Sequence, residues 1–175
     1  MTHKELVARA VKWLTSGPSL HRCSVICAEL VTAGAETPDV IGWHWGNSEM
    51  IEVKVSRSDF LADKKKPHRI FPESGMGEFR WYLCPANMIG ENEIPEGWGL
   101  LYAHPTKITV EVHALKQDCN HKNERIFLNS LIRRIAQVQP EGLFARHYSP
   151  ETNANISIES EPIAEDESLR RSNEH

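Results

Sequence analysis

Asp39, Glu52 and Lys54 are two carboxylates and an amine, which together could cut a phosphodiester bond if the fold gathers them. Residues 50–55 read Met-Ile-Glu-Val-Lys-Val, an alternation of apolar and charged residues that predicts a strand with two different faces. Because side chains two apart share a face of a strand, Glu52 and Lys54 should project together, roughly 6 to 7 Å apart. That spacing suits one metal ion and one water.

A second strand, predicted at residues 39–43, must bring Asp39 to the same place. Gly46 and Asn47 tolerate positive φ, and we predict them as the two loop residues of a hairpin that joins the strands. In that register Asp39 opposes Lys54, and all three polar side chains share one face of the sheet. A slip of one residue would move Asp39 to the opposite face.

The remaining periodicities predict an α/β fold, in which helices flank a mixed sheet that contains the hairpin. An amphipathic helix is expected before Gly17, and Ser56 should cap a second helix that Pro67 stops. The other expected elements are a strand within residues 23–32, strands at 80–84, 98–104 and 107–115, and a helix at 123–139.

With Pro38-Asp39 as one element and Glu52-Val53-Lys54 as the other, the sequence resembles the PD-(D/E)xK nuclease superfamily. The continuation Ser56-Arg57-Ser58-Asp59-Phe60 is similar to small bacterial and phage nuclease-like proteins related to the mitomycin-resistance DNA-repair family. The resemblance spans residues 20–135. It implies a restriction-endonuclease-like mixed sheet flanked by helices.

The resemblance also implies roles for the matched residues. Asp39 and Glu52 would hold a divalent cation, with help from the carbonyl of Val53, and Lys54 would orient or activate the attacking water. Mg²⁺ is the expected cation, with Mn²⁺ as a substitute, because carboxylate oxygens suit hard cations. Glu29 is an additional candidate acid, and its alternative is a strand-edge residue that faces solvent.

A run of basic residues follows the proposed site closely in sequence. Contact with a nucleic-acid phosphate backbone is one interpretation, and a charged helix end favoured by the macrodipole is the other. The residues are Arg57, Lys64, Lys65, Lys66, His68 and Arg69.

The net charge of −4 is unevenly distributed along the 175 residues. Residues 149–175 hold seven acids against two arginines and no aromatic residue, so the remainder is nearly neutral. We therefore expect one nuclease-like domain at residues 1–140, followed by an acidic tail at 141–175 that is disordered or loosely packed. No apolar run approaches the roughly 20 residues of a membrane span, and a cytoplasmic location is expected.

Four cysteines and nine histidines do not predict a zinc site from their spacing. On a strand, Cys23 and Cys27 would lie roughly 13 Å apart, too far to share a tetrahedral ion. Cys119-Asn120-His121 is not a usual ligand pair. Reduced thiols, mostly buried, are the simpler expectation.

The predicted function is metal-dependent hydrolysis of DNA phosphodiester bonds in DNA repair, recombination or phage DNA processing. The alternative is a noncatalytic nucleic-acid-binding or protein-interaction module on the same fold. The sequence does not determine whether RNA is also a substrate or whether the enzyme acts as an exonuclease or an endonuclease. Homodimerisation is also left open.

Overall fold

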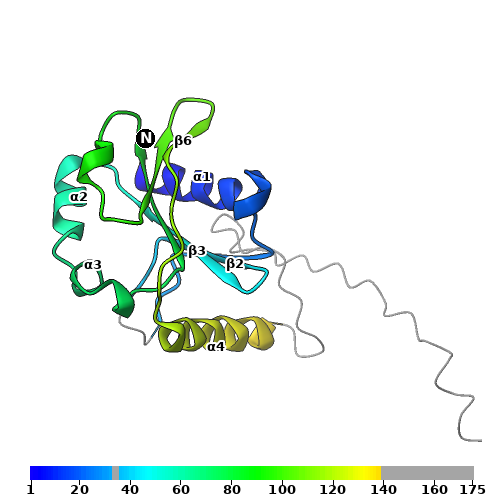
Figure 1. The fold of residues 1–175 in the computed structure, drawn as a ribbon. Helices are drawn as coiled ribbons and strands as arrows, with labels where there is room; N and C mark the ends of the chain where they lie inside the picture. The colour runs from blue at the N-terminus through cyan, green and yellow to red at the C-terminus, as the bar shows by residue number, and fades with distance from the viewer. Residues whose placement is uncertain (33–35, 139–175) are drawn as a thin grey trace, which may run out of the picture.

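A computed structural model describes residues 1–32 and 36–138, which form an α/β fold around a mixed sheet (Figure 1). This confirms the predicted fold class. The six strands of the sheet follow the order β1-β2-β3-β4-β5-β6. They are β1 (Val25–Ala28), β2 (Val40–His44), β3 (Asn47–Val53), β4 (Phe79–Pro85), β5 (Gly99–Ala103) and β6 (Ile108–Val112). The helices are α1 (His3–Ser16), α2 (Arg57–Asp63), α3 (Pro67–Ile70) and α4 (His121–Val138), with short 3₁₀ turns at Ser19–His21, Pro72–Ser74 and Glu91–Glu93.

Strand direction changes across the sheet. The pairs β1-β2, β2-β3 and β5-β6 are antiparallel, whereas β3-β4 and β4-β5 are parallel. The crossover from β3 to β4 contains α2 and α3. Because the carboxyl ends of β3 and β4 meet at one edge of the sheet, residues after β3 lie where α/β proteins commonly bind ligands.

Both faces of the sheet are covered by apolar packing. Helix α1 covers one face, where Leu6 and Leu14 pack in a core with Ile51 and Trp81. Helices α2 and α4 contribute Phe60, Phe127 and other side chains to the opposite core, which contains Met50 and Tyr82 of the sheet. Figure 1 shows α1 and α4 on opposite sides of the sheet. Polar side chains on the central strands are therefore buried on either face.

The hairpin between β2 and β3 turns at Trp45 and Gly46, whose φ angles of 47° and 82° suit a two-residue turn with both φ positive. The predicted loop at Gly46-Asn47 is wrong by one residue, since Asn47 already pairs with His44. This changes the register by two, so Asp39 no longer opposes Lys54. A shift of two residues preserves the faces of a strand, so the predicted common face is compatible with the observed register.

The helix that follows β3 begins as predicted, with the Ser56 side chain accepting a hydrogen bond from the Asp59 N–H. Helix α2 ends at Asp63, earlier than the sequence indicated. Pro67 is the first residue of α3. Proline is favourable there because the N–H groups of the first helical turn have no partner within the helix.

No helix within residues 1–32 and 36–138 is long and apolar enough to cross a bilayer. The acidic tail predicted at 141–175 lies outside the described residues.

Candidate functional site

The carboxyl end of β3 brings Glu52 and Lys54 together beside Asp39. The register pairs Val40 with Ile51, and its continuation by one residue sets Asp39 opposite Glu52. The Asp39 Oδ2 atom accepts a hydrogen bond of 2.8 Å from the Val53 N–H, which fixes the carboxylate against β3. The Lys54 Nζ atom lies 3.3 Å from Glu52 Oε2. The structure thus gathers the three residues that sequence reasoning selected.

Lys54 is held between two acids rather than one. Its backbone N–H extends the parallel pairing beyond β3 by donating to the Leu83 carbonyl. Its Nζ atom also lies 3.1 Å from Oδ1 of Asp63, at the end of α2, and both side chains are almost fully buried. Sequence reasoning missed Asp63. A signal was present, because Asp63 lies three residues after the buried Phe60 and so shares the inward face of the helix.

Arg69 of α3 is the centre of a buried ion network. Its guanidinium lies 3.2 Å from Glu52 Oε1, 2.8 Å from Asp63 Oδ2 and 2.7 Å from Glu36 Oε1. Burial alone would raise the pKa of Asp63, but Arg69 and the two neighbouring lysines, Lys54 and Lys66, lower it well below its usual range. Asp63 therefore stays charged and anchors both Arg69 and Lys54.

Glu52 behaves differently from Asp63. The pKa of Glu52 is raised to about 7. Burial is the largest cause and the nearby Asp39 carboxylate adds to it, while Arg69, Lys54 and Lys66 oppose the shift. Two acids with opposite pKa shifts therefore share the same three cations. This pattern is common where carboxylates handle protons or metal ions, although structural ion networks also produce it.

Asp39 also contacts the first turn of α1. Oδ1 of Asp39 lies 3.2 Å from Nε2 of His3, and Nδ1 of the same ring lies 3.5 Å from Oε1 of Glu29. The candidate acid Glu29 thus lies next to the site, directly after β1, with a φ of 52°. Sequence reasoning missed His3, because no local pattern predicts which strand end the first turn of a helix will face.

The basic residues predicted to bind nucleic acid separate into two groups. Arg57 and His68 pair with Glu93 and Glu36, respectively, and Arg69 is enclosed by carboxylates. The remaining three, Lys64, Lys65 and Lys66, are exposed near the end of α2. Of these, Lys66 also pairs with Asp63 at 2.7 Å. Phosphate contact stays a prediction, and the exposed lysines are its best candidates.

The donor set at Asp39 and Glu52 fits a hard divalent cation. Three of the four carboxylate oxygens accept hydrogen bonds, whereas Glu52 Oε1 has, among the described residues, only the ion pair with Arg69. An ionised carboxylate can accept about two interactions per oxygen. The effect of Asp39 on the pKa of Glu52 reports repulsion between the two carboxylates. A cation bound to both would offset that repulsion.

Another buried carboxylate, Glu49, lies on the opposite face of β3. Its oxygens contact Nδ1 of His21 at 2.8 Å, Nε2 of His44 at 3.3 Å and Nε1 of Trp81 at 2.7 Å. The His21 ring stacks on Trp13 and meets Trp81 edge-on. Sequence reasoning did not select this group, and its enclosure among aromatic rings indicates a structural role.

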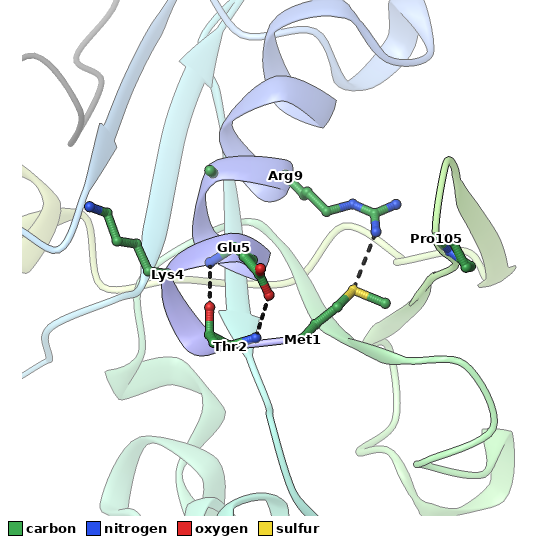
Figure 2. A pocket seen from close by; sticks show the side chains of 7 residues that line it. Met1, Thr2, Lys4, Glu5, Arg9 and Pro105 are labelled. Atoms are coloured by element: carbon green, nitrogen blue, oxygen red, sulfur yellow. Dashed lines mark hydrogen bonds between the residues drawn. The ribbon is translucent and has the colours of Figure 1, made fainter.

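A hollow at the N-terminus of α1 contains no comparable chemistry (Figure 2). Thr2 and Glu5 form the capping box of α1 there, which uses their polar atoms locally. Arg9 donates to the backbone carbonyls of His104 and Lys107. The lining residues are Met1, Thr2, Lys4, Glu5, Ala8, Arg9 and Pro105.

Comparison with known proteins supports the fold but supplies no function. No protein-family model matches the sequence, and no curated protein matches it. The solved structure of SPO1766, a protein of unknown function from Silicibacter pomeroyi, is similar, with a TM-score of 0.57 and 24% sequence identity. The similarity covers 82% of this chain and 97% of that one. At this identity the likeness shows the α/β fold alone.

Proposed function

We propose that this protein is a metal-dependent nuclease that hydrolyses DNA phosphodiester bonds at the carboxyl end of β3. The observation that carries the proposal is the register of β2 and β3, which sets Asp39 opposite Glu52 with Lys54 on the same face. The PD-(D/E)xK pattern requires this juxtaposition of an acid, a second acid and a lysine. The α/β sheet provides it at an edge where parallel strands end.

Asp39 and Glu52 would hold Mg²⁺ or Mn²⁺. Such an ion, when bound, polarises a phosphoryl oxygen and lowers the pKa of its water. Val53 contributes through its N–H, which orients Asp39. This differs from the carbonyl ligand that the sequence resemblance implies, and that role of Val53 stays a prediction.

Lys54 would position the attacking water or a phosphate oxygen. An ammonium group has three N–H donors, and contacts to Glu52 and Asp63 use two of them. The third can donate to a group that enters beside Glu52. Asp63 and Arg69 fix the directions of Lys54 and Glu52, so they act as positioning residues.

The test is a cleavage assay on labelled single-stranded, duplex, branched and RNA substrates, titrated with Mg²⁺ and with Mn²⁺. We expect cleavage to require the metal and to fall by roughly 10²-fold or more in Asp39→Asn and in Lys54→Ala. Glu111→Gln, which removes an exposed carboxylate from β6, is the matched control and should cleave like the wild type. Metal-dependent cleavage that persists unchanged in both site variants would overturn the assignment.

A noncatalytic nucleic-acid-binding or protein-interaction module is the second candidate, and one observation favours it. Glu52, Lys54, Asp63 and Arg69 already neutralise one another in a network that is almost fully buried. Such a network can serve packing specificity alone. DNA binding without cleavage at any metal concentration, in correctly folded protein, would support this alternative.

A further inference from the structure

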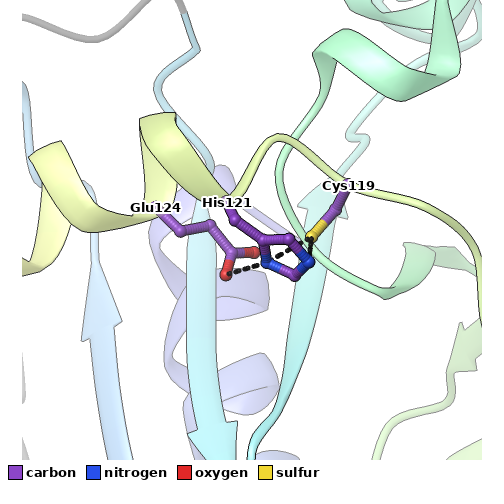
Figure 3. Close-up of side chains that lie close together, drawn as sticks. All are labelled: Cys119, His121 and Glu124. Carbon is purple, nitrogen blue, oxygen red and sulfur yellow. Dashed lines mark hydrogen bonds and ion pairs between the residues drawn. The ribbon is translucent and has the colours of Figure 1, made fainter.

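Cys119, His121 and Glu124 converge where the chain enters α4, although the sequence analysis predicted no metal site there (Figure 3). One ligand atom from each residue lies within 4.8 Å of the other two. The set offers a sulfur, an imidazole nitrogen and a carboxylate oxygen. Zn²⁺ accepts all three types of donor, whereas Mg²⁺ strongly prefers oxygen.

One separation matches those around a tetrahedral ion, and a second is slightly longer. The Sγ atom of Cys119 lies 3.4 Å from Nδ1 of His121, and that nitrogen lies 4.0 Å from Oε2 of Glu124. Ligand atoms around tetrahedral Zn²⁺ lie roughly 3.3 to 3.6 Å from one another, given Zn–S of about 2.3 Å and Zn–N and Zn–O of about 2.0 to 2.1 Å. Small side-chain adjustments would therefore suffice for all three to bind one ion.

The Glu124 carboxylate is already oriented for this task. Its Oε1 atom accepts hydrogen bonds from the Ser48 hydroxyl at 2.7 Å and from the Gly77 N–H at 2.8 Å. Gly77 presents that N–H with a φ of 81°, a conformation that favours glycine. The other oxygen, Oε2, is the one nearer His121. A carboxylate held by one oxygen with the other directed at a histidine is typical of metal ligands supported by a hydrogen-bonded outer layer.

We propose that Cys119, His121 and Glu124 bind Zn²⁺ through three protein ligands, with a fourth position open to solvent beside the exposed His121 ring. The Ser48 that supports Glu124 and the Glu52 of the nuclease site lie four residues apart on β3, which is roughly 13 Å. The two sites are therefore separate and take different classes of ion. Through Ser48 and Gly77, bound Zn²⁺ would fasten the start of α4 to β3 and to the segment before β4.

The test uses Co²⁺ as a spectroscopic substitute in full-length protein stripped of metal by a chelator. We expect a thiolate-to-Co²⁺ charge-transfer absorption at one equivalent, removed by competing Zn²⁺ and absent in Cys119→Ser. His121→Ala, which alters an exposed side chain, should weaken Zn²⁺ binding at least tenfold and reduce the rise in melting temperature that Zn²⁺ produces.

Two controls separate this site from others. His113→Ala removes another exposed histidine and should bind Zn²⁺ like the wild type. Asp39→Asn should keep the thiolate absorption, because its carboxylate belongs to the other site. The proposal is overturned if folded wild-type protein shows no thiolate absorption. It is also overturned if Cys119→Ser or His121→Ala binds Zn²⁺ with unchanged affinity.

Discussion

Glu49 and Glu52 are buried carboxylates on the same strand, and their surroundings differ in kind. Glu49 faces α1 and is bonded by two imidazoles and an indole that themselves pack as rings. Glu52 faces the opposite side, next to Asp39, and its partners are the amines and guanidinium of Lys54, Lys66 and Arg69. Burial alone therefore does not identify a functional acid.

The two carboxylates differ in whether a bound metal ion could replace one of their present partners. Glu49 is fully buried, and its partners Trp81, His21 and His44 are themselves buried rings, so exchanging them would disturb the core. Lys66, in contrast, is partly exposed and lies 3.8 Å from Glu52. The partly exposed Asp39 carboxylate would supply a second oxygen ligand under the proposed function. A carboxylate that has a like-charged neighbour and a movable counter-ion can accept a metal ion, whereas a carboxylate locked by rings contributes to stability.

The largest difference expected between Glu49 and Glu52 is in the rate of DNA cleavage. We expect Glu52→Gln to lower the metal-dependent cleavage rate by about 10²- to 10⁴-fold, since a neutral amide holds a cation poorly. Glu49→Gln should retain most of the activity of the protein that remains folded. Rates are measured at saturating Mg²⁺ and corrected for the folded fraction. Equal losses in the two variants would show that the site is not confined to one face of β3.

The pH dependence of stability should report the surroundings of Glu52. Burial raises the pKa of Glu52 from its ordinary 4.5 to about 7, so the metal-free folded state binds a proton more tightly than the unfolded chain. Its contribution to stability is thus full below pH 4.5 and is lost as pH rises through 7. Relative to Glu52→Gln, the free energy of unfolding of the wild type should fall by on the order of 3 kcal/mol across that window.

Urea unfolding with a chelator present, repeated across that range of pH, measures this difference. Parallel curves for the wild type and Glu52→Gln would contradict the raised pKa.

A smaller loss of stability is expected at Glu49. Glu49→Gln replaces an acceptor by an amide donor next to Trp81 Nε1 or a histidine nitrogen, which leaves a buried donor without a partner. We expect a cost of about 1 to 3 kcal/mol in the free energy of unfolding at neutral pH. Glu52→Gln should cost less there, because Arg69 keeps Asp63 and Glu36. Denaturant titration gives both values, and the reverse order would refute the structural role of Glu49.

The smallest effect concerns the exposed lysines beside Glu52. If Lys64 and Lys65 contact phosphates, each change to Ala should lower the slope of log affinity against log salt by about 1, with the free energy of unfolding unchanged. Lys12→Ala, on α1 and away from this edge, is the matched control. An unaltered slope would favour the alternative, in which these lysines form a charged helix end stabilised by the macrodipole.

Much of the fold could be predicted because its determinants are local. Alternation in residues 50–55 gave β3, and the Ser56 cap gave the start of α2. The hairpin loop was wrong by one residue because Trp45 adopts positive φ, which side-chain preferences disfavour. The predicted face survived the error because strands repeat every two residues.

Other parts of the site could not be predicted. His3 and Glu36 reach Asp39 and Arg69 across long stretches of chain, and their meeting depends on how α1 and α3 pack on the sheet. For the same reason the sequence did not reveal that Arg69 turns inward to three carboxylates. Glu124 was overlooked as a partner of Cys119 and His121.

The sequence alone determined which side chains share a strand face. It thereby placed Glu52 beside Lys54, with Asp39 across the hairpin from them. Tertiary packing decided which carboxylates keep their charge. That outcome depends on burial and on cations brought from distant segments, because the free energy of a charge inside a protein is set by all of its neighbours in space.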